Sequence, residues 1–167
     1  MSASVGEAFF QELLWVHGMI RQDLETVRAL AALVAGGLPA GEVAEQVASL
    51  AANGPLWALK VNCLHYCRFV HGHHRLEDVA LFPALRDAEP DLAPLVDRLE
   101  GDHRRVAEQL DEVEAAVGAL NGDESERGRV VDVLDALAGD LLAHLEREEE
   151  SIGPALRRMD RHPLSFR

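Results

Sequence analysis

A histidine is followed four residues later by a glutamate at two places in the chain, His73 with Glu77 and His144 with Glu148. Residues i and i+4 of an α-helix project from one face, one turn apart. Each pair would therefore direct an imidazole nitrogen and a carboxylate the same way. Imidazole with carboxylate is a ligand set that suits iron, manganese or zinc.

The two pairs belong to a longer internal repeat. The tetrapeptide Pro-Ala-Leu-Arg follows each pair, starting at Pro83 and at Pro154, ten residues after the histidine in both copies. Two other histidines, His17 and His103, are each followed by aliphatic residues three and seven positions later. Two similar helical hairpins would place the four histidines around a pseudo-twofold axis.

Apolar residues surround both pairs on the helix faces they occupy. Val70 lies about one turn before His73, and Leu141 about one turn before His144. Two buried carboxylates that face each other repel and lose their hydration, and cations between them remove that cost. The alternative to a metal site is that each histidine is an ordinary core residue whose ring nitrogens are hydrogen-bonded within the protein. Two copies of the pair, and a histidine on each remaining helix, favour a metal site.

Glycines, prolines and polar turns divide the chain into four long helical segments joined by short connections. The predicted helices are Val5 to Val34, Pro55 towards Asp87, a third from between Pro90 and Pro94 to near Asn121-Gly122, and a fourth from about Asp123 to Ser125 as far as Met159. A short amphipathic piece covers Gly41 to Ala52. The sequence predicts an all-α fold, an antiparallel up-down four-helix bundle with a short extra helix between helices 1 and 2, as a single domain of residues 1–167.

Composition limits the partners of this domain. The 167 residues are 48% hydrophobic and 27% charged, with a net charge of -13. An acidic surface disfavours nucleic acid and anionic membranes. The N-terminus lacks the basic and apolar regions of an export signal, so we expect a cytoplasmic protein. Cys63 and Cys67 are then expected to be reduced thiols in the core.

The segment His73 to Leu85 resembles the signature of the hemerythrin-like, or HHE cation-binding, family, and His144 to Leu156 resembles a second copy of it. The resemblance extends from His17 to Leu156. It implies a four-helix bundle that holds a carboxylate-bridged pair of non-haem iron ions. It also implies the ligands: His17 and His73 for one iron, His103 and His144 for the other, and Glu77 and Glu148 as bridges.

The match departs from hemerythrin itself on two helices. Hemerythrin has a second histidine one turn after the first on its third helix, where this chain has Ala107. Its bridging residue on the fourth helix is an aspartate five residues after the histidine, whereas Glu148 follows after four. We therefore expect six ligands and an exchangeable position on one iron. His74 could supply the missing ligand, but it is rotated by about 100° from His73 around the helix axis, so we expect it rather to flank the site.

Ferritin-like di-iron proteins are an alternative class, but they carry two Glu-x-x-His pairs. This chain has only Glu100 with His103, so Glu100 is expected to lie outside the ligand set. Tyr66 either hydrogen-bonds a metal-bound ligand or is a core tyrosine with a satisfied hydroxyl. Arg21 either neutralises a carboxylate near the site or, as we expect, forms a surface salt bridge. Pro83 should weaken the helix one turn earlier, near residue 79.

A reduced di-iron pair with an open position would bind oxygen, peroxide or nitric oxide. We expect a protein that binds oxygen or turns over peroxide in oxidative-stress defence, with peroxide decomposition of a catalase-like kind as the enzymatic form. The alternative is a non-catalytic protein that binds, stores or senses oxygen or iron. No motif identifies a redox partner.

Overall fold

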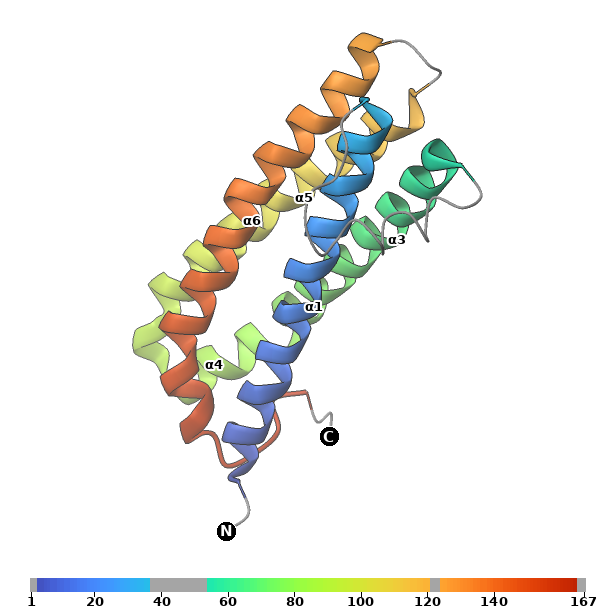
Figure 1. The fold of residues 1–167 in the computed structure, drawn as a ribbon. Helices are drawn as coiled ribbons and strands as arrows, with labels where there is room; N and C mark the ends of the chain where they lie inside the picture. The colour runs from blue at the N-terminus through green and yellow to red at the C-terminus, as the bar shows by residue number, and fades with distance from the viewer. Residues whose placement is uncertain (1–2, 37–53, 121–123, 165–167) are drawn as a thin grey trace.

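The computed structural model describes residues 3–36, 54–120 and 124–164, and all regular structure within these ranges is helical (Figure 1). The elements are α1 (Val5–Val34), α3 (Pro55–Leu76), the π-helix η2 (Glu77–Leu81), α4 (Phe82–Ala88), the 3-10 helix η3 (Pro90–Leu92), α5 (Ala93–Gly118) and α6 (Glu124–Arg158). The all-α prediction is confirmed. The predicted short helix from Gly41 to Ala52 lies outside the described residues.

The helix ends follow local sequence signals. The side chain of Ser4 accepts a hydrogen bond from the backbone N–H of Glu7 and so caps the start of α1. Gly36 has a φ of 92° just after α1 ends, a conformation that favours glycine. Pro55 occupies the first turn of α3, where its missing N–H has no helical partner to lose.

The four long helices pack side by side (Figure 1). Both α1 and α5 pack against α3 and against α6. Gly6, near the start of α1, lies against the end of α6, where a Cβ atom on Gly6 would meet the carbonyl oxygen of Leu156 at 2.1 Å. Arg28, near the end of α1, pairs with Asp135 in the first half of α6 at 2.8 Å. None of the helices in the described ranges is long and apolar enough to cross a membrane.

A layer of buried polar side chains separates two apolar clusters in the core. One cluster lies on the side of Ile20 and Val106, and the other on the side of Leu13 and Leu99. The buried polar residues between them are His17, His74, Glu77, Asp102, His103, His144 and Glu148. Because apolar residues close both ends of this layer, its polar atoms must find their partners within it.

The predicted second helix is divided by a π-helical turn. The backbone N–H of Phe82 donates to the carbonyl of Glu77, five residues earlier, and η2 covers Glu77–Leu81. Pro83 has no N–H to donate to the carbonyl of Val79, which explains why regular α-helical bonding fails there. The weakening expected near residue 79 therefore appears as a wider turn rather than as an end of the helix.

Candidate metal centre

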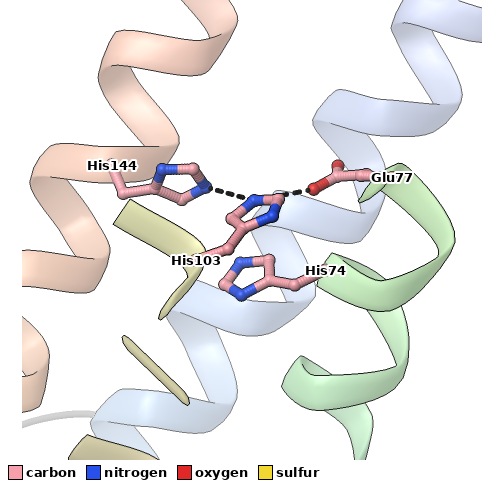
Figure 2. Close-up of side chains that lie close together, drawn as sticks. All are labelled: His74, Glu77, His103 and His144. Carbon is pink, nitrogen blue, oxygen red and sulfur yellow. Dashed lines mark hydrogen bonds and ion pairs between the residues drawn. The ribbon is translucent and has the colours of Figure 1, made fainter. Parts of the chain in front are cut away.

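All six predicted ligands converge in the polar layer, together with His74. They form two groups whose candidate ligand atoms lie within 4.8 Å of one another. The first group is His17, His73, Glu77 and Glu148, and the second is His74, Glu77, His103 and His144. Figure 2 shows the second group, in which His103 lies between His144 and Glu77. Glu77 belongs to both groups.

The two carboxylates contact histidines from different helices. Oε1 of Glu77 lies 3.0 Å from Nε2 of His73 and 3.9 Å from Nε2 of His17, whereas its Oε2 lies 3.3 Å from Nε2 of His103. Oε2 of Glu148 lies 3.5 Å from Nε2 of both His17 and His144. Each carboxylate thus reaches histidines of both groups, as a bridging ligand must.

Most inward-facing atoms of this layer lack a hydrogen-bond partner; Nε2 of His103 and Nε2 of His144, which lie 3.1 Å apart, are the exceptions among the candidate ligands. The unpartnered buried atoms include Nε2 of His17, His73 and His74 and both carboxylate oxygens of Glu77 and of Glu148. Buried polar atoms in folded proteins are nearly always hydrogen-bonded or bound to an ion. Nitrogen and carboxylate atoms that face one another, and that have no hydrogen-bond partner in the protein, fit bound cations.

The pKa values of the two buried carboxylates are shifted in opposite directions. Burial, followed by the charge of Glu77, raises the pKa of Glu148 well above its ordinary value. Burial alone would also raise the pKa of Glu77, but the nearby imidazoles of His103, His17 and His73 hold it well below its ordinary value. The shifts favour the ionised form of Glu77 and the protonated form of Glu148, as expected for two close acids in an apolar core.

Two neighbouring histidines are also shifted in opposite directions. Burial would lower the pKa of His103, but hydrogen bonds to Asp78 and Glu77 outweigh it and raise the value to about 9. Burial and the nearby His103 lower the pKa of His144 to about 4. These shifts favour the charged form of His103 and the neutral form of His144.

His74 lies within the second group and not beside it, as the alternative of an additional ligand requires. Its side chain is buried, and its ring stacks on that of His103 with centroids 4.0 Å apart and planes 10° apart. His73 instead faces His17, with ring centroids 5.2 Å apart. Because α3 packs against both α1 and α5, consecutive side chains can reach the layer from two directions. The angle between His73 and His74 around the axis of α3 therefore does not exclude either histidine from the layer.

The placement of His74 bears on the open position expected next to Ala107. The group around His103 already contains three imidazoles and Glu77, so a seventh donor is present although Ala107 offers none. The group around His17 contains two imidazoles and two carboxylates. A coordination position open to exchange is therefore expected in the group around His17.

Three other expectations concern residues close to the site in sequence. Glu100 pairs with Arg86 at 2.9 Å and does not belong to either metal-binding group. The hydroxyl of Tyr66 donates to the carbonyl of Ile20 at 3.3 Å, as a satisfied core tyrosine does. Both Cys63 and Cys67 are free and buried, as expected.

Arg21 forms more than a surface salt bridge. Its guanidinium donates to Oε1 of Glu149 at 2.7 Å, and the same oxygen lies 2.8 Å from Nδ1 of His17. Although burial alone would raise the pKa of Glu149, hydrogen bonds from Arg21 and His17 hold it below its ordinary value. The ionised carboxylate thus accepts a proton-bearing nitrogen from each side.

Sequence reasoning missed Glu149 and two similar acids. Asp78 contacts Nδ1 of His103, and Asp102 contacts Nδ1 of His144. Each of the three acids is the immediate neighbour of a predicted ligand in the sequence, which is the one signal that could have identified them.

An apolar cavity of about 120 Å³ adjoins the group around His17. His73 and Glu77 form part of its wall, and the other lining residues are Phe9, Glu12, Leu13, Val16, Leu76, Leu81 and Leu164. The cavity therefore joins two candidate metal ligands to a space with mostly hydrocarbon walls.

Comparison with known families identifies the class of protein that this fold and site define. The family model for the hemerythrin HHE cation-binding domain matches residues 8–156, and the chain belongs to this family. Comparison with curated proteins and with solved structures gave no significant match. Membership of the family implies a metal-binding site, in agreement with the two histidine and glutamate groups.

Proposed function

We propose that the chain holds two non-haem iron ions in a carboxylate-bridged di-iron centre. One ion would be bound by His17 and His73, and the other by three histidines. The full proposed ligand set is His17, His73, His74, Glu77, His103, His144 and Glu148. The observation that carries this proposal is the set of buried imidazole nitrogens and carboxylate oxygens left without any protein partner.

The chemistry of the donors supports iron. The two groups offer imidazole nitrogens and carboxylate oxygens but no thiolate, because neither Cys63 nor Cys67 belongs to them. This mixture suits metals of intermediate softness such as ferrous and ferric iron. Bundle cores with facing histidines and carboxylates are a common setting for paired iron ions.

We also propose that the domain, residues 1–167, is an antiparallel up-down bundle. The contacts of Gly6 with the end of α6, and of Arg28 with its first half, support opposite directions for α1 and α6. In that arrangement the two motifs that contain His73 and His144 would be related by the pseudo-twofold axis.

The proposed role is binding of oxygen or nitric oxide, or turnover of peroxide, in oxidative-stress defence in the cytoplasm. Iron would supply one-electron redox steps and a binding position for the small ligand. The protein's part is to admit that ligand: the apolar cavity beside His73 and Glu77 favours small uncharged molecules and disfavours ions. The alternative of non-catalytic oxygen or iron binding requires the same metal site without turnover.

Metal analysis and rapid-mixing spectroscopy test these proposals. Protein reconstituted with ferrous iron without oxygen should contain two ions per chain, and a content of one or none would reject the di-iron proposal. Mixing the reduced protein with oxygen and with peroxide then separates the roles. Reversible colour change indicates binding, whereas peroxide loss faster than with the same concentration of free iron indicates catalysis.

A further inference from the structure

Two carboxylates outside the proposed ligand set contact the outer nitrogens of its histidines. Oδ1 of Asp78 lies 2.7 Å from Nδ1 of His103, and Oε1 of Glu149 lies 2.8 Å from Nδ1 of His17. In both rings Nε2 faces Glu77 or Glu148. If Nδ1 keeps the proton and donates it to the acid, Nε2 keeps the lone pair that a metal needs.

The two contacts follow from one unit of the internal repeat. In each copy a ligand is followed by a second acid: Asp78 follows Glu77, and Glu149 follows Glu148. The first acid of each unit faces the polar layer, while the second reaches a histidine on a neighbouring helix. Asp78 extends from η2 to α5, and Glu149 extends from α6 to α1.

A third acid repeats this relation on another pair of helices. Asp102 precedes His103 on α5, and its Oδ2 lies 3.4 Å from Nδ1 of His144 on α6. The same oxygen accepts a hydrogen bond from Arg147. Asp102 is 6% exposed, so its charge is compensated by the arginine rather than by water.

The three acids differ in their cationic partners. Glu149 is paired with Arg21, and Asp102 is paired with Arg147. No lysine or arginine in the described part of the chain forms an ion pair with Asp78, whose side chain is 39% exposed. Water screens part of its charge, but its contact with His103 is the shortest of the three.

We infer that Asp78 is a positioning residue that makes the two proposed metal ions unequal, an inference that rests on the proposed di-iron function. An acid without a paired cation draws the Nδ1 proton of His103 more strongly than a compensated acid does. The ring then becomes a stronger electron donor at Nε2 and favours the oxidised ion. Arg21 weakens the same effect of Glu149 on His17.

Charge-removing variants with retained shape test this inference. Asn in Asp78→Asn can still accept from Nδ1 of His103, so the ring stays oriented while the charge is lost. The variant should weaken the binding of one ion by about 10- to 100-fold, measured by chelator competition with cobalt(II). It should also raise the reduction potential of the iron-loaded protein, measured by spectroelectrochemistry.

Three further variants provide the comparison. Glu149→Gln should raise the potential by less than Asp78→Asn, because Arg21 already compensates the acid. Arg21→Gln should shift the potential the opposite way, downwards, a result that general damage to the fold does not produce. Glu150→Gln removes a charge from an exposed neighbour with no described contact to the site and should change neither readout.

The inference is overturned if Asp78→Asn matches Glu150→Gln in potential and affinity, or if Glu149→Gln has the larger effect. If Asp78→Asn does not fold, Arg21→Gln provides the test instead. A reduction potential of Arg21→Gln that rises or stays constant also overturns the inference. Failure of the proposed function looks different, because the unaltered chain itself would then not load two ions.

Discussion

Glu148→Gln should have opposite effects on stability with and without metal. The substitution replaces one carboxylate oxygen of a fully buried side chain with an amide nitrogen and leaves the volume almost unchanged. Each bound ion stabilises the folded chain by about 2.7 kcal/mol at a free metal concentration a hundredfold above its Kd. Two ions contribute about 5 kcal/mol, or roughly 10–20 °C in Tm for a chain of this length. The variant should lose most of this gain, because a bridging oxygen contacts both ions.

In the metal-free chain the same substitution should become favourable as the pH rises. The pKa of Glu148 is raised in the folded chain above its ordinary value of 4.5, so the folded chain keeps a proton that the unfolded chain releases. The stability contributed by that protonated group is fully present below pH 4.5 and is lost as the pH rises through the raised pKa. Glutamine does not ionise and avoids this loss.

Thermal melts followed by circular dichroism measure both effects. Wild type, Glu148→Gln and the exposed control Glu150→Gln are compared with a chelator and with ferrous iron under anaerobic conditions, each at mildly acidic and mildly alkaline pH. An equal metal-induced rise in Tm for wild type and Glu148→Gln would show that Glu148 is not a ligand. A metal-free Tm difference that stays constant with pH would refute the raised pKa.

Three further results are expected. His74→Ala should retain one ion per chain instead of two by elemental analysis, whereas the exposed His65→Ala should retain both; two ions in His74→Ala would return His74 to a flanking role. Val16→Phe should partly fill the apolar cavity and slow the reaction with oxygen severalfold in stopped-flow mixing, at unchanged metal content, and an unchanged rate would mean that ligands enter elsewhere. Gly6→Ala should destabilise the fold by about 1–3 kcal/mol in chemical denaturation, because its Cβ would collide with backbone atoms of α6. At Gly18 a Cβ meets no atom within 4 Å, so Gly18→Ala should instead stabilise the helix by about 0.5–1 kcal/mol. Equal effects of Gly6→Ala and Gly18→Ala on stability would contradict the close approach of Gly6 to α6.

The sequence alone predicted the long helices and six of the residues that meet between them. The paired glycines Gly36 and Gly37 favour a helix end, so the predicted bounds of the first helix agree with α1, Val5–Val34. The spacing of four residues fixes two side chains on one helical face, which is why His73 with Glu77, and His144 with Glu148, could be paired in advance. The repeat then suggested how His17 and His103 would join them.

Only the tertiary structure decided which neighbouring helix each of the remaining side chains faces. Helical periodicity gives the angle between His73 and His74 but not the positions of α1 and α5, which receive them separately. The same limit hid Asp78 and Glu149, because their contacts join residues of different helices. The apolar cavity likewise exists only where side chains of α1, α3 and η2 meet. Contacts between helices depend on how the helices pack. That packing is determined by all core side chains together, so a short stretch of sequence does not reveal it.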